Sequence, residues 1–74
     1  MEDKDRKLLA YIIACISEFA RSTSLSAQEA FRYLDSYGGI DFLFEHYDTE
    51  HLLSLDDAVD DLKIITNNAG GTIV

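Results

Sequence analysis

The chain has 74 residues, and its 14 acidic side chains outnumber its 6 basic ones, which gives a formal net charge of -8. Binding to nucleic acid and attraction to an anionic membrane both depend on Lys and Arg side chains, so this charge balance argues against both partners. One domain is the most that a chain of this length forms. The composition therefore favours a small acidic protein whose partner is another protein.

The apolar share of the chain, 47%, is too high for a disordered segment, so we expect a packed fold. Proline is absent and the only cysteine is Cys15, which excludes a disulfide framework and agrees with a reducing compartment. The apolar run 8–16 is far shorter than the roughly 20 residues that span a bilayer. The mixed charges before it are unlike those of a signal peptide. We therefore expect a cytoplasmic protein.

The first predicted helix begins at about Asp3 or Asp5 and ends at Arg21. Apolar residues recur at helical spacing and predict a broad buried stripe made of Leu8, Ile12, Cys15 and Phe19, widened by Leu9, Ile13, Ile16 and Ala20. Ala10 and Ala14, with Tyr11 beside them, form a second face of small, weakly polar residues. This face is either ordinary exposed surface or the seam of a homodimer.

The second predicted helix begins with a capping box. Ser26 and Glu29 stand three residues apart, so each side chain can accept a hydrogen bond from the backbone N–H of the other residue. Its predicted buried residues are Ala27, Ala30, Phe31 and Leu34. The glycines at 38 and 39 end this helix, because glycine adopts the left-handed conformation that often follows a helix.

The segment 40–47 is open to two interpretations, a short helix or a strand. We predict a short helix, since no second strand pattern is available to pair with it. Residues 48–50 are predicted to form a turn, and 51–53 another turn of helix. The last helix begins after Ser54, and its predicted buried residues are Leu55, Ala58, Val59, Leu62 and Ile65. Residues 67–71 end it, and the tail from about residue 68 is expected to be less ordered. The sequence thus predicts an all-α fold, a small bundle of three longer helices and one short helix in a single domain covering 1–74.

Four aspartates form the most unusual feature of the last predicted helix. They are Asp56, Asp57, Asp60 and Asp61. An advance of 100° per residue places the last three opposite the buried stripe, with the apolar Ile64 among them. Like charges four residues apart each cost a few tenths of a kcal/mol, roughly, in a helix. The surface is either a solvated acidic face with one stray isoleucine or a docking surface for a basic, partly apolar partner.

Residues that could carry chemistry are few. His46 and His51 lie within an acidic segment, but structural zinc sites have closer histidines together with cysteines, so helix caps and solvated turn residues are the better interpretation. Cys15 lies in the middle of the buried stripe, which predicts an unreactive thiol. The glycine pairs end helices rather than cradle phosphate, and no serine has the setting of a nucleophile. We predict no catalytic residue, no cofactor and no metal, and hence a protein that is not an enzyme.

Three segments of the chain are distinctive: Ala-Phe-Arg-Tyr-Leu at 30–34, Tyr-Gly-Gly-Ile-Asp-Phe-Leu at 37–43, and His-Leu-Leu-Ser-Leu-Asp-Asp-Ala-Val-Asp-Asp-Leu at 51–62. Together they resemble a family of short bacterial helical proteins known only as a domain of unknown function. The resemblance covers about residues 8–65 and implies a small helical bacterial protein. Related small proteins are encoded near an ADP-ribosyltransferase-like toxin, so the resemblance also implies an antitoxin-like or accessory role. It supplies no functional residues.

The sequence therefore predicts a non-enzymatic protein–protein interaction module. The predicted partner-binding residues are Asp56, Asp57, Asp60, Asp61 and Ile64, and the predicted self-association residues are Ala10, Tyr11 and Ala14. A homodimer is expected. The alternatives are a structural homo-oligomer or scaffold without a charged partner and, less favoured, a metal-responsive regulator that uses His46 and His51.

Overall fold

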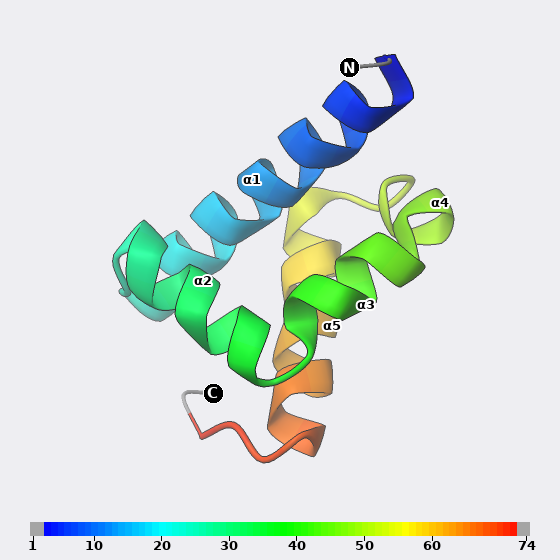
Figure 1. The fold of residues 1–74 in the computed structure, drawn as a ribbon. Helices are drawn as coiled ribbons and strands as arrows, with labels where there is room; N and C mark the ends of the chain where they lie inside the picture. Colours follow the sequence, from blue (N-terminus) through cyan, green and yellow to red (C-terminus); the bar gives the residue numbers. More distant parts are fainter. Residues whose placement is uncertain (1–2, 73–74) are drawn as a thin grey trace.

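The computed structural model describes residues 3–72, which form five α-helices and no strand (Figure 1). The helices are α1 (Asp3–Thr23), α2 (Ala27–Ser36), α3 (Gly39–Glu45), α4 (Tyr47–Glu50) and α5 (Leu55–Asn68). The predicted all-α bundle is confirmed, and 40–47 is helical rather than extended. The turn predicted at 48–50 is wrong, since these residues belong to α4. Residues 73 and 74 of the predicted tail lie outside the described residues.

The helices pack around α1, the longest of them. α1 contacts α2, α3 and α5, and α3 contacts α2, α4 and α5. In Figure 1, α2 runs beneath the C-terminal half of α1. The next two helices, α3 and α4, lie to the right of α2, and α5 lies partly behind α3. The radius of gyration is 11.5 Å, close to the roughly 11 Å that a compact domain of this length shows.

One core joins α1, α2, α3 and α5. Its largest fully buried side chains are Phe19, Leu34, Leu43, Leu62, Thr66 and Cys15. Cys15 and Phe19 of α1 are four residues apart, as are Leu62 and Thr66 of α5, which agrees with the helical spacing that predicts the buried stripes of these two helices. The core is small, so each of these side chains makes a large share of the buried apolar surface.

Polar side chains fix the beginnings of α2 and α5. The Ser26 hydroxyl accepts from the Glu29 N–H at 3.1 Å, and the Glu29 carboxylate accepts from the Ser26 N–H at 3.0 Å. The predicted capping box is therefore confirmed. The hydrogen bond from the Ser26 backbone N–H, followed by the interaction with the Ser26 side chain, lowers the pKa of the Glu29 carboxyl group. At α5, the Ser54 hydroxyl accepts from the Asp57 N–H at 3.1 Å, as its predicted cap position requires.

A residue in the left-handed backbone conformation follows each of three helices, α1, α2 and α5. Gly38 has a φ of 81° and Gly70 a φ of 106°, so both predicted glycine stops are used. After α5, the Gly71 N–H donates to the Thr66 carbonyl oxygen at 2.9 Å. α1 ends in the same way without a glycine, because Ser24 adopts a φ of 60° and the Leu25 N–H donates to the Ala20 carbonyl oxygen.

The buried stripe of α1 is narrower than predicted. Leu9 and Ile13 were expected to be buried, but both are exposed, and 62% of Ile13 is accessible. The cause is the sharp bend between α1 and α2, which measures 104°. Because α2 leaves the axis of α1 at this angle, it covers only the C-terminal half of that helix (Figure 1).

Three further residues predicted to be buried are exposed. They are Ala27 and Phe31 of α2 and Leu55 of α5. On α2 the buried face is centred on Ala30, Tyr33 and Leu34, and the Tyr33 ring stacks on Phe19 at a centroid distance of 5.9 Å. Phe31 lies 100° away from Ala30 around the helix and so points outward. Leu55 is the first residue of α5, and the buried residues of this helix begin three positions later, at Ala58.

Candidate functional site

The outer face of α5 carries most of the predicted partner-binding residues. Asp56, Asp57 and Asp60 are exposed, and 58% of the Ile64 side chain is accessible. The opposite side of the helix buries Ala58, Val59 and Leu62 against the core. We call the set Asp56, Asp57, Asp60 and Ile64 the outer face of α5.

The carboxylates of this face have no ion pair within the described chain. Among residues 3–72 one ion pair forms, between Arg21 and Glu18. The N-terminal end of α5 offsets part of the repulsion between Asp56 and Asp57, since the partial positive charge of a helix begins there. Asp60 lies beyond that first turn and forms no ion pair among residues 3–72. Asp56 is different, because the pKa of the Arg21 guanidinium of α1 is raised by Glu18 and, less strongly, by the charge of Asp56. The outer face therefore combines the exposed Ile64 with carboxylates that form no ion pair among the described residues.

Asp61 does not belong to the outer face, contrary to the sequence prediction. Its side chain is half-buried, and its carboxyl group lies within hydrogen-bonding reach of the Glu50 carboxyl group. The helical geometry explains this position. Asp61 directly precedes the buried Leu62 and is 100° from it, whereas Ile64 is 200° from it and points to solvent.

Glu50 is the residue that sequence reasoning missed. Only 4% of it is exposed, and its Oε2 atom has no hydrogen-bond partner among residues 3–72. The sequence interpretation treated residues 45–51 as solvated turn residues and caps, which is wrong for Glu50. One signal was available: in a helix through 47–50, Glu50 falls on the same side as Tyr47, three residues earlier.

Tyr11 and Cys15 of α1 complete a buried polar cluster with Glu50 and Asp61. The Tyr11 hydroxyl lies against the Cys15 thiol, which is a weak hydrogen-bonding group, and has no stronger partner. Burial, then the contact with Cys15, raises the pKa of Tyr11 far above its ordinary value. Burial also raises the pKa of the Cys15 thiol, which the contact with Tyr11 opposes in part. Both groups therefore stay protonated at neutral pH.

Glu50 has the most perturbed carboxyl group of the cluster. Burial, followed by the hydrogen bond and the negative charge of Asp61, raises the pKa of Glu50 to about 7. A carboxyl with such a pKa carries its proton through the mildly acidic range and loses it near neutrality. We call the set Tyr11, Cys15, Glu50 and Asp61 the polar cluster.

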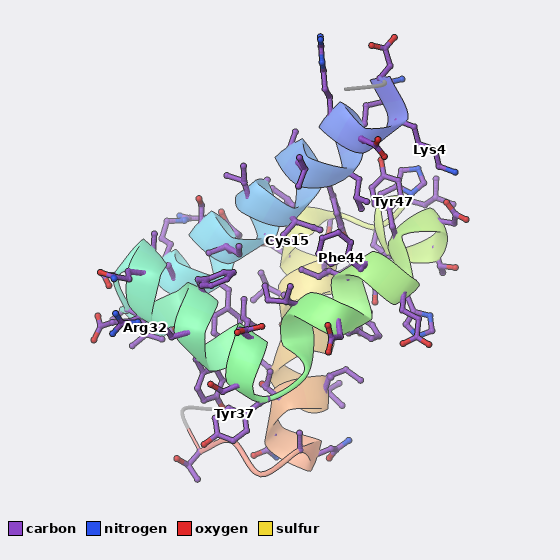
Figure 2. The ribbon with its side chains drawn as sticks, in the orientation of Figure 1. Lys4, Cys15, Arg32, Tyr37, Phe44 and Tyr47 are labelled. Atoms are coloured by element: carbon purple, nitrogen blue, oxygen red, sulfur yellow. The ribbon has the colours of Figure 1, made fainter. Side chains whose placement is uncertain are left out.

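Tyr11, one of the predicted self-association residues, is half-buried and makes a ring contact within the monomer. Its ring packs edge-to-face on Tyr47 with a centroid distance of 5.5 Å, and Figure 2 shows Tyr47 between α4 and the first half of α1. Ala10 is exposed and Ala14 is half-buried. Tyr11 thus packs within the monomer, and self-association through this side of α1 stays a prediction.

The two histidines do not approach a common site. The His51 ring stacks on Tyr47 at 4.5 Å, and its Nδ1 lies 2.6 Å from the Tyr47 carbonyl oxygen. The His46 ring packs against Phe42 at 4.9 Å. In the described part of the chain no three His, Cys, Asp or Glu side chains are arranged to hold a metal ion, and no pocket is enclosed.

None of the described helices has, by itself, both the length and the apolar character needed to cross a membrane. α1 and α2 reach that threshold only when counted together across the bend that separates them.

The fold and its surface define a small acidic all-α protein. Residues 10–68 match the family described as "Protein of unknown function (DUF3791)", and the chain belongs to this family. The matched range extends from the first half of α1 to the last residue of α5, so it includes both the outer face of α5 and the polar cluster. No curated protein and no solved structure matches the chain.

Proposed function

We propose that this protein is a non-enzymatic protein–protein interaction module that works in the cytoplasm. It binds a basic partner protein through the outer face of α5. The observation that carries this proposal is the exposed Ile64 beside Asp57 and Asp60, two carboxylates without an ion pair among the described residues. A partner with Lys or Arg around an apolar contact would neutralise the charge and bury the isoleucine in one step.

The two components of this face have different energetic roles. An exposed ion pair contributes only about 0–1 kcal/mol, whereas burying an isoleucine side chain contributes about 1.5–3 kcal/mol. Ile64 would therefore supply affinity. The aspartates would accelerate and orient the encounter, and this contribution weakens as salt is added.

Charge also bears on which partner is favoured. A second copy of the chain carries the same net charge of -8, so it is repelled from the outer face, whereas a basic protein is attracted. The family resemblance adds the proposal that the partner is the product of a neighbouring gene and that the role is antitoxin-like or accessory. A structural homo-oligomer is the second candidate, and the exposed Leu9 and Ile13 on α1 favour it.

Charge reversal tests the proposal. The variant Asp57→Lys/Asp60→Lys is expected to lose its partner in affinity capture from cells that carry the gene, by about tenfold or more, while the helical content stays unchanged. The matched control is Asp3→Lys/Asp5→Lys, which changes the net charge equally at exposed residues of α1. This control is expected to keep the partner.

A third variant separates the apolar contribution from the charge. Ile64→Ser leaves every charge in place and is expected to weaken capture at all salt concentrations, whereas the charge reversal matters most at low salt. If all three variants captured the same proteins in the same amounts as the wild type, the outer face of α5 would not be the binding surface.

A further inference from the structure

The Glu50 carboxyl group lies where α4 meets α1 and α5. Its charge acts on Tyr11 and Cys15 of α1, and it lies within hydrogen-bonding reach of Asp61 of α5. Only 4% of Glu50 is exposed, and in the described part of the chain its Oε2 atom has no hydrogen-bond partner. An ionised carboxylate only accepts hydrogen bonds, so a hydrogen bond between two carboxyl groups requires a proton on one of them.

No positive charge compensates this pair. The groups that face Glu50 are the Tyr11 hydroxyl and the Cys15 thiol from α1 and the Asp61 carboxyl from α5. Its neighbour His51 is turned to Tyr47, and Lys4 of α1 is exposed. The charged residues of α3, the helix packed against α4, are Asp41 and Glu45, and both are exposed. Neither Glu50 nor Asp61 forms an ion pair in the described chain. A buried carboxylate beside a half-buried one, without a cation, is unfavourable, and one proton on the pair removes the repulsion between the two charges.

We propose that Glu50 and Asp61 form a proton-binding site that holds α4 against α1 and α5 while it contains one proton, and that releases α4 when the proton is lost. α4 has only four residues, and the ring contact between Tyr47 and Tyr11 is its other anchor on α1. A second negative charge at Glu50 repels Asp61 and draws water toward both carboxylates. α4 and the following turn, 51–54, then move more freely. This inference is independent of the proposed function.

The direction of the pH effect follows from the proton balance. The pKa of Glu50 is raised from its ordinary value of 4.5 to about 7 in the folded protein. Between these two values the folded state holds a proton that the unfolded state has lost. Stability contributed by the pair is therefore complete in the acidic range, falls as pH rises toward 7, and is lost above it.

Two measurements test the site. The first is the titration of the Glu50 side-chain carboxyl carbon by NMR, and its midpoint is expected near 7. The second is urea denaturation from about pH 5 to about pH 8. The wild type is expected to lose stability across this range, whereas Glu50→Gln, which resembles the protonated side chain, keeps a nearly constant midpoint. Protection factors of the amides in 50–53 should fall with pH in the wild type only.

Two matched variants identify the groups involved. Asp61→Asn removes the neighbouring charge and is expected to lower the Glu50 midpoint by about one pH unit or more. His51→Gln removes a neighbouring titratable ring and is expected to leave the wild-type profile unchanged. A Glu50 midpoint near 4.5, its ordinary value, would overturn the proposal, as would a Glu50→Gln variant that keeps the pH-dependent loss of stability. The NMR titration uses the wild type and decides the question even if a variant fails to fold.

Discussion

At the level of single residues, a contact between two acidic groups joins Glu50 of α4 to Asp61 of α5. Glu50 and Asp61 are eleven positions apart, and nothing in their local spacing indicates that their carboxyl groups meet. The contact exists because α4 ends beside the middle of α5, a tertiary arrangement that periodicity does not encode. By contrast, the burial of Cys15 could be predicted, since it depends only on its place within an apolar stripe.

Gly71 illustrates a close contact that no sequence pattern reveals. A Cβ atom at this position would lie 2.7 Å from the Tyr33 Cζ atom and 2.9 Å from the Thr66 carbonyl oxygen. Tyr33 cannot easily withdraw, because it is buried between the rings of Phe19 and Tyr37. We predict that Gly71→Ala lowers the free energy of unfolding, measured with urea, by about 1–3 kcal/mol.

The adjacent Thr72 supplies the control for this prediction. Thr72 is exposed, so Thr72→Ala should change the free energy of unfolding by less than about 0.5 kcal/mol. Equal stability of the two variants would mean that the chain after α5 is not held against Tyr33.

Helix beginnings and helix ends were predictable to different degrees. The capping box at Ser26 and Glu29 was predictable because its two hydrogen bonds are local, and the glycine stops because a residue in the left-handed conformation is usually glycine. The stop at Ser24 carries no such signal. Its conformation follows from the path of the chain toward α2 rather than from its residue type.

Ser24 is therefore a position where glycine should be better than the native residue. The left-handed conformation costs a non-glycine residue about 1–2 kcal/mol, and glycine adopts it freely. After the entropy that glycine loses on folding, we predict that Ser24→Gly stabilises the protein by about 0.5–1 kcal/mol, measured by thermal denaturation followed by circular dichroism.

Ser22 provides the matched comparison, because it is an exposed serine two residues earlier and still within α1. Ser22→Gly should destabilise the protein by about 0.5–1 kcal/mol. A loss of stability in Ser24→Gly would show that the serine side chain contributes more at this position than the backbone strain removes.

The width of each buried face was the main error at the level of helices. Periodicity gives the direction of the apolar stripe on α1, but the stripe is buried only where another helix covers it. The bend of 104° between α1 and α2 leaves Leu9 and Ile13 uncovered. The same reasoning applies to α4, a single turn of helix whose formation depends more on its contacts with α3, Tyr11 and Asp61 than on its own propensity.

At the scale of the whole molecule, charge and exposed apolar surface act in opposite directions. The net charge of -8 keeps copies of the protein apart. The exposed Leu9 and Ile13, next to Ala10 on α1, favour contact between copies. Which effect prevails depends on ionic strength. At 0.1 M salt, repulsion between charges more than about 10 Å apart is largely screened, whereas the apolar attraction stays intact.

We therefore predict that the mass measured by light scattering is that of the 8.3 kDa monomer at low salt and rises toward that of a dimer as NaCl is added. Ile13→Ser should keep the protein monomeric throughout, because it removes the most exposed apolar residue of α1. Ile64→Ser, a change of the same kind on the outer face of α5, should leave the salt dependence as it is. If Ile64→Ser prevented association instead, the surface proposed here for a basic partner would be the contact between copies, and the charge argument that separates the two surfaces would be wrong.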